Sequence, residues 1–153
     1  MAVTPTPVFP QTSNVGRAKI GATANTNSSG TGTAGTDIMK AFTAGANGSH
    51  IDAIMFIPVA TSAATATTAT TLRAFISTVS SGATTGGTDT FLIGELTAAS
   101  QTADHSTTAI TPLYLALPTG GLDLASGDYI YGAAHVVNAA NTHWQMVVYG
   151  RDY

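Results

Sequence analysis

The most regular alternation of apolar and polar side chains runs from His50 to Val59. An apolar residue occupies every second position of this segment, and these residues are Ile51, Ala53, Met55, Ile57 and Val59. A period of two is typical of a strand that buries one face, so the pattern predicts a strand with these side chains towards the core. Pro58 has no backbone N–H, which predicts that the strand ends there, is bulged there or lies at a sheet edge.

Seven further stretches have the short, apolar composition of strands. They are residues 16–22, 37–44, 71–79, 90–97, 107–117, 128–137 and 142–150. Asn47-Gly48 separates 37–44 from the alternating segment, and this dipeptide is typical of a hairpin turn because both residues tolerate positive φ. We expect a second hairpin between the last two strands, with its loop at residues 138–141.

The segments between these strands predict loops. Residues 23–36 and 80–89 are small, polar and free of periodicity. Residues 60–71 are almost entirely Thr and Ala, and we expect a long connection there because β-branched Thr disfavours a helix. About eight short strands without a helix predict a single antiparallel β-sandwich, jelly-roll-like, over residues 15–153.

The first fourteen residues form a separate segment. Its three prolines are Pro5, Pro7 and Pro10. Each fixes φ, removes a backbone donor and favours extended geometry in the residue before it. Residues 1–14 are therefore expected to form an extended N-terminal arm that lies against another subunit, with Val8 and Phe9 as its apolar contacts.

Charge is unusually scarce in this chain. Of 153 residues, 8% are charged, against about 25% in an ordinary protein. Two explanations fit: neighbouring subunits cover much of the surface, or Thr and Ser hydrate it sufficiently. The net charge of −3 and the scattered cations argue against a nucleic-acid partner. The absence of cysteine excludes disulfides and thiolate chemistry. We expect no membrane span and no secretion signal, and therefore synthesis in a cytoplasm.

The sequence contains few groups suited to catalysis, and we expect no catalytic residues. It has no nucleophile elbow and no phosphate-binding loop. Glu95 is the single glutamate, and most aspartates stand beside Gly or Ser in predicted turns. A carboxylate pair of the glycosidase kind stays open, because two distant strands can supply one, but nothing favours it.

His50 and Asp52 lie two positions apart on a predicted strand and therefore share a face. This arrangement can present two ligands to a metal ion, and the more common alternative is an exposed polar pair at a strand start. We favour the polar pair and expect no metal and no cofactor. His135 and His143 are expected on opposite faces of the last hairpin, where they would not bind one ion together.

Aromatic side chains concentrate in the predicted last hairpin, where Tyr129, Tyr131, Trp144 and Tyr149 occur. Such side chains suit stacking against a sugar, with His135 beside Trp144. A core or interface position is the more common use of a single tryptophan. A carbohydrate-binding module is therefore the alternative function.

Three stretches carry a family resemblance. They are Thr31-Gly32-Thr33 with Phe42 to Ser49 and Ile51-Asp52, then Leu117 to Gly120 with Leu124 to Asp128, and finally Tyr149 to Tyr153. With the Pro/Thr arm, these stretches resemble a family of small structural proteins of tailed-phage and prophage particles, of the capsid decoration (cement) type. The chain departs from the family at Arg151, where a second Gly is usual, and in its long Thr/Ala connection.

The resemblance implies a non-enzymatic virion protein, made in the bacterial host cytoplasm and located on the capsid surface. Such a subunit stabilises the head shell by bridging major capsid proteins, and we expect it to be a homotrimer. The residues expected at the capsid or subunit interface are Val8, Phe9, Arg17, His135, Trp144, Arg151 and Tyr153. The alternative within this setting is a carbohydrate-binding jelly-roll module of a phage head fibre or tail.

Overall fold

The computed structural model describes residues 12–61, 65–103 and 109–153, and this part of the chain is built from strands and contains no helix. The strands are β1 (Thr12–Ile20), β2 (Gly32–Ala34), β3 (Met39–Thr43), β4 (Ser49–Ala60), β5 (Thr70–Ser77), β6 (Gly82–Thr84), β7 (Thr90–Ala98), β8 (Leu113–Leu115), β9 (Leu122–Leu124), β10 (Tyr129–Ala134) and β11 (Thr142–Asp152). Within the described ranges, therefore, no helix is available to cross a membrane.

The strands form two packed sheets with nested antiparallel pairing. Sheet I has the order β1-β11-β4-β8, with β9 pairing the other end of β4, and sheet II has the order β3-β10-β5-β7. The innermost pair along the chain is β5 with β7, followed outwards by β4 with β8 and β9, β3 with β10, and β1 with β11. This nesting across two sheets is the jelly-roll arrangement, so the predicted fold class is confirmed.

The main core lies between sheets I and II. Its largest members, Phe42, Phe56 and Trp144, are at most 2% exposed. Burying one such side chain contributes roughly 2–3 kcal/mol relative to leaving it in water. Because strands of both sheets supply this cluster, the two layers depend on each other.

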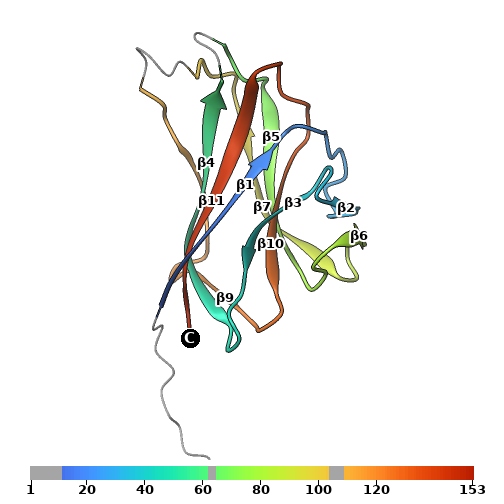
Figure 1. The fold of residues 1–153 in the computed structure, drawn as a ribbon, viewed down its shortest axis with the longest axis vertical. Helices are drawn as coiled ribbons and strands as arrows, with labels where there is room; N and C mark the ends of the chain where they lie inside the picture. The colour runs from blue at the N-terminus through green and yellow to red at the C-terminus, as the bar shows by residue number, and fades with distance from the viewer. Residues whose placement is uncertain (1–11, 62–64, 104–108) are drawn as a thin grey trace, which may run out of the picture.

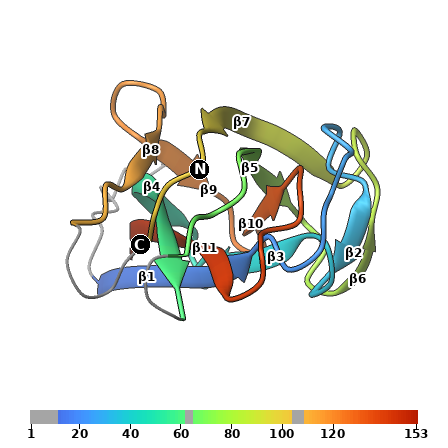
Figure 2. The same ribbon diagram turned by 90° about the horizontal axis from the view of Figure 1, so that it is seen from above.

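In the described part of the chain, a third layer covers the outer face of sheet II and not that of sheet I. The strands β2 and β6 pair as a short ribbon beside sheet II (Figure 2). Ile38, Phe75 and Tyr131 form a second, fully buried cluster on this side. The outer face of sheet I differs, since Val15, Tyr114 and Tyr149 remain 42%, 66% and 42% exposed. Both strands of the ribbon fall in segments expected to be loops, so the strand count there was too low.

Neither predicted hairpin forms. The strands β3 and β4 belong to different sheets, and so do β10 and β11. Gly48 does adopt a positive φ of 92° in a turn closed by its N–H and the carbonyl of Gly45. The two hairpin predictions are wrong because residues that favour a turn reverse the chain direction but do not determine which strand the next one pairs with. Covering the core from both sides sends consecutive strands to opposite sheets.

A β-bulge changes which side chains of β4 face the core. Tyr149 pairs with Ala53 and Gly150 with Ile51, so Asp52 is the extra residue. Ile54 and Phe56 are fully buried beyond the bulge. Their odd-numbered neighbours Ala53, Met55, Ile57 and Val59 therefore turn to the outer face, contrary to the expected alternation, and only Ile51 keeps its predicted place. Along the described chain Pro58 pairs with β11 alone, in agreement with a local sheet edge.

The sandwich begins at Thr12 rather than at residue 15, because Thr12 to Asn14 pair with Asp152 to Gly150. The arm residues 1–11, with Val8 and Phe9, lie outside the described residues. In the Thr/Ala connection, residues 65–67 are extended against residues 101–103, and Thr67 donates its N–H to the carbonyl of Gln101. No helix forms in the described part of this connection, as expected.

Gly16 sets how closely β1 approaches β3. A Cβ atom at this position would lie 2.1 Å from the carbonyl oxygen of Ala41. We expect Gly16→Ala to lower the free energy of unfolding by about 1–3 kcal/mol, because a backbone atom cannot move aside cheaply. Gly94→Ala is the control, since the nearest atom there is the flexible Cδ1 of Leu115 at 3.2 Å. Equal effects of the two substitutions in urea unfolding would contradict this assignment.

Candidate functional site

Parts of all three stretches that carry the resemblance meet at one end of sheet I, where Ser49 pairs with Asp152 on one side and with Leu124 on the other. Thr31 to Thr33 lie elsewhere, at β2 of the ribbon. Arg151 pairs with His50, and His50 pairs on its other side with Asp123. Thr12 pairs with Asp152, so the described chain also begins at this end. Figure 1 shows the C-terminus at the lower end of the molecule, close to β9 and to the start of β1.

Five side chains form a network at this end, which we call the C-terminal cluster: His50, Asp52, Asp123, Arg151 and Tyr153. The Tyr153 hydroxyl donates to Asp123 Oδ1 at 2.6 Å, and His50 Nδ1 lies 2.7 Å from the same oxygen. Arg151 donates to Asp52 from Nε at 3.1 Å and from Nη2 at 2.5 Å. His50 Nε2 lies 3.7 Å from Asp52 Oδ1 and so links the two halves.

Backbone features position this cluster. The bulge at Asp52 turns its carboxylate to the outer face, where Arg151 meets it. Gly121 has a φ of 87° and lies against the His50 ring, so a Cβ atom there would be 2.7 Å from His50 Nε2. Glycine thus allows the loop before β9 to close over the imidazole.

Hydrogen bonding shifts three pKa values in the cluster, in the direction that favours the charged forms of Asp123 and Arg151 and the neutral hydroxyl of Tyr153. The pKa of Asp123 is lowered, first by the Tyr153 hydrogen bond and then by His50. The Asp123 bond raises the pKa of Tyr153, and the Asp52 bonds raise that of Arg151. The Asp123 side chain is 72% exposed, so these bonds order the surface without creating a desolvated reactive group.

The cluster leaves little capacity for a metal ion. His50 and Asp52 do share the outer face, as the sequence predicts. Asp52 is engaged by Arg151 and the His50 ring by Asp123, so the strongest ligand atoms already have partners. In residues 12–61, 65–103 and 109–153, no three His, Asp or Glu side chains are placed to bind a metal together.

A partly buried clasp centred on Asp152 lies beside the cluster. Ser49 Oγ donates to Asp152 Oδ1 at 2.6 Å and accepts the N–H of Gly45 at 2.9 Å. Asn14 Nδ2 donates to the same carboxylate at 2.9 Å. Asp152 therefore ties together β1, β4 and the turn before β4.

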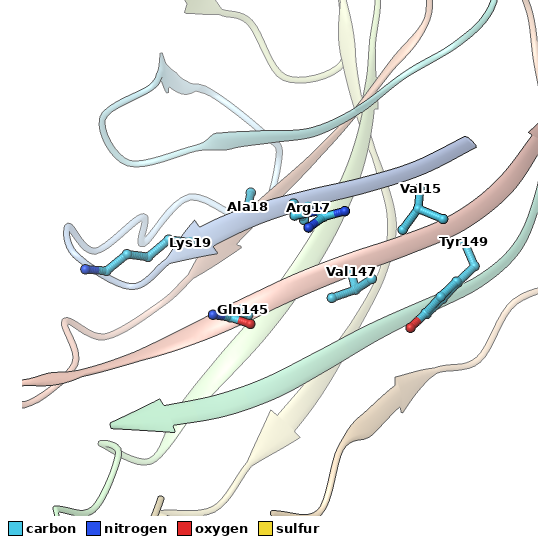
Figure 3. Close-up of a pocket in the computed structure, with 7 residues that line it drawn as sticks. All are labelled: Val15, Arg17, Ala18, Lys19, Gln145, Val147 and Tyr149. Carbon is cyan, nitrogen blue, oxygen red and sulfur yellow. The ribbon is translucent and has the colours of Figure 1, made fainter. Parts of the chain in front are cut away.

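A shallow groove runs along the outer face of sheet I, between β1 and β11 (Figure 3). We call it the open-face groove; it has a volume of about 480 Å³ and is lined by Val15, Arg17, Ala18, Lys19, Gln145, Val147 and Tyr149. The Tyr149 ring extends from β11 towards β4 in Figure 3. Lys19 and Gln145 pair at one end of the groove, and Val15 and Tyr149 pair at the other end. Arg17 and Val147 pair between these two ends.

The charge of this groove is unbalanced. Of the five cations in the chain, Arg73 and Arg151 have carboxylate partners and Lys40 lies 5.0 Å from the centre of the Tyr129 ring. Arg17 and Lys19 form no ion pair with any described residue. Nearby, burial lowers the pKa of His143, with the Lys19 charge as the second cause. The groove thus holds two cations, Arg17 and Lys19, that no described carboxylate neutralises.

The structure separates the interface residues expected from sequence. Arg151 and Tyr153 meet in the C-terminal cluster, and Arg17 lies on the same outer face in the groove. His135 follows β10 of sheet II, with Nδ1 3.5 Å from Arg73 Nη1.

Trp144 is fully buried in the main core, so its prediction as an interface residue is wrong. The same burial removes Trp144, and also Tyr131, as platforms for a sugar. Core-facing positions of a central strand attract the largest apolar side chains, which is why this tryptophan lies inside.

Sequence reasoning missed Asp123 and Tyr114. Asp123 joins the cluster through β9, whose three residues are too few to establish a period. Tyr114 lies on β8 beside a second depression of about 530 Å³ that includes Asp52 and Arg151. Neither position could be found without knowing that β8 and β9 pair with β4.

Together the fold and this surface define a jelly-roll β-sandwich with one covered and one open sheet face. Comparisons with protein-family models, curated proteins and solved structures find no match to the chain.

Ser49→Ala tests the clasp. Ser49 is completely buried, and its loss leaves the N–H of Gly45 and the Asp152 carboxylate each short of a partner. We expect the free energy of unfolding to fall by about 1–3 kcal/mol. Ser13→Ala, on the exposed surface of β1, should change it by less than about 0.5 kcal/mol. A Ser49 variant as stable as the Ser13 variant would contradict the clasp.

Asp123→Asn tests the electrostatics of the cluster. Because folding lowers the pKa of Asp123, its stabilisation is present above the ordinary value of 3.8 and is lost as the pH falls through the lowered value. The wild type should exceed Asp123→Asn in unfolding free energy near neutral pH, and the difference should vanish in acid. Tyr153→Phe removes one hydrogen-bond donor to the same carboxylate. It should lower the unfolding free energy near neutral pH by less than Asp123→Asn does, and this difference should also vanish in acid. A difference that persists unchanged in strong acid would refute this pKa argument.

Proposed function

We propose that this chain is a structural subunit of a tailed-phage particle, a capsid decoration protein that stabilises the head shell by bridging major capsid proteins. The observation that carries the proposal is the unequal covering of the two sheets. The chain uses residues 21–38 and the β2–β6 ribbon to bury the outer face of sheet II, while the outer face of sheet I stays open. An open sheet face bearing Val15, Val147 and Tyr149 suits contact with another protein.

The scarcity of charge supports the same proposal. A protein that stays free in solution generally relies on surface charge for solubility. With 8% charged residues, this chain is better suited to an assembly in which neighbours cover its surface. The groove and cluster residues are fixed by strand pairing, so docking would cost little ordering of the backbone.

The end of the molecule where Thr12 lies supports a role for the N-terminal arm. Thr12 pairs with Asp152, so residues 1–11 join the sandwich at the end that holds Arg151 and Tyr153. Burying Phe9 of the arm against a capsid protein would contribute ~2 kcal/mol at each contact. Many copies on one shell would multiply this contribution.

Binding to shells tests the proposal. Shells assembled from the major capsid protein of the same genome are mixed with the purified chain and sedimented. We expect the full chain to co-sediment and to raise the temperature at which the shells disrupt. A chain lacking residues 2–11 should keep the circular dichroism spectrum of a β-protein and bind shells more weakly. Thr4→Ser is the control and should bind shells as the wild type does.

Two outcomes would count against parts of the proposal. A full-length chain that fails to co-sediment with shells at saturating concentration would refute the capsid role. Equal binding by the intact and the shortened chain would refute the role of the arm alone.

A further inference from the structure

We infer that the open-face groove is one half of a head-to-tail contact between copies of this chain, and that its occupant is the surface around Phe91 of the next copy. The inference rests on the proposed function, since it names the surfaces that would join subunits of a decoration trimer.

A threefold ring needs two different, complementary surfaces on each subunit. In a twofold dimer one patch meets itself, but in a closed ring of three, patch one of each copy meets patch two of the next. The open-face groove supplies the first patch, with an apolar floor of Val15, Val147 and Tyr149. Its charges, Arg17 and Lys19, lack carboxylate partners along the described chain.

The second patch lies on sheet II, where β7 begins. Phe91 is 50% exposed there, beside a depression of about 200 Å³ that includes Ile76, Asp89 and Asp128. We call these four residues the Phe91 patch. Asp89 accepts hydrogen bonds from Thr85 N at 2.8 Å and Thr90 Oγ1 at 2.7 Å, and Asp128 accepts one from Ala125 N at 2.9 Å. Neither carboxylate has a cationic partner among the described residues.

The two patches are complementary in apolar surface and in charge. An exposed phenyl ring and a shallow apolar floor exclude water together, and the unpaired cations of one patch match the unpaired anions of the other. A groove-to-groove contact would instead bring Arg17 and Lys19 of both copies together, and like charges oppose that arrangement. Charge complementarity therefore favours the Phe91 patch as occupant.

The experiment uses two single variants of the full chain, alone and mixed. Arg17→Glu reverses a charge in the groove, and Phe91→Lys replaces the ring by a cation that faces the cationic groove. Each variant alone should associate more weakly than the wild type by about tenfold or more, as measured by sedimentation in roughly 0.1 M salt. Lys40→Glu and Leu92→Lys are the matched controls, because Lys40 lies outside both patches and Leu92, 41% exposed, points to the other side of β7. Both controls should assemble as the wild type does.

Mixing distinguishes the possible contacts. The Arg17→Glu copy keeps its Phe91 patch and the Phe91→Lys copy keeps its groove, so a head-to-tail contact predicts heterodimers in the mixture. The double variant in one chain should recover part of the assembly, because a glutamate then faces a lysine across each contact.

Three outcomes would overturn the inference. They are a mixture without heterodimers, single variants that assemble as tightly as the controls, and a wild type that is monomeric up to about 100 µM. Shell binding is measured separately in each case. A chain that binds shells but fails these tests would refute this inference and leave the proposed function standing.

Discussion

The pairing of the first described strand with the last is the constraint on which the structure depends. β11 lies between β1 and β4 and is paired along its length on both sides. Its core face contributes Trp144, Met146 and Val148, which are completely buried. Its outer face contributes Val147, Tyr149 and Arg151 to the groove and the cluster. One strand thus contributes to the core and to the open face together, and its pairing with β1 joins segments far apart in the sequence. Such long-range pairing is slow to form, because loop closure comes before the contacts that reward it.

Among the described residues, the outer face of sheet II is covered and that of sheet I is not, because the connections that contain β2 and β6 pass over sheet II. The connection from β1 to β3 returns over sheet II and meets β6 there. Thr84 Oγ1, fully buried, donates to the carbonyl of Gly30 at 2.7 Å and holds the two segments together. Arg73, also buried, reaches Glu95 and the carbonyl of Asn25 from the same side. Sheet I receives no comparable layer from the described residues, and Val15 and Tyr149 on its outer face stay 42% exposed.

Sequence patterns located the strands better than their partners. The segments around Phe42, Ile76 and Tyr131 were found because apolar and β-branched residues cluster between turn residues. Partner choice was missed at Asn47-Gly48, where a genuine turn leads into the opposite sheet. The orientation of β4 was missed because a single extra residue, Asp52, inverts every later side chain. The β2–β6 ribbon was missed because Gly32 to Ala34 and Gly82 to Thr84 carry no alternation, and their order comes from packing against Ile38 and Phe75.

The candidate site was predictable only in part, for a related reason. Arg151 and Tyr153 stood out in a distinctive terminal motif, yet their partners Asp52 and Asp123 lie far away in sequence and meet them through strand register. Most of this motif acts within the subunit: Asp152 closes the clasp, Arg151 holds the bulge carboxylate, and Tyr153 fixes β9 through Asp123. These three residues are needed to hold the first and last described strands in place, whatever partner the subunit binds. The open-face groove is different, because Arg17 and Lys19 make no ion pair that stabilises the described subunit. Under the proposed function, selectivity for a partner would belong to the groove, while the terminal motif keeps β11 in the register that shapes the groove.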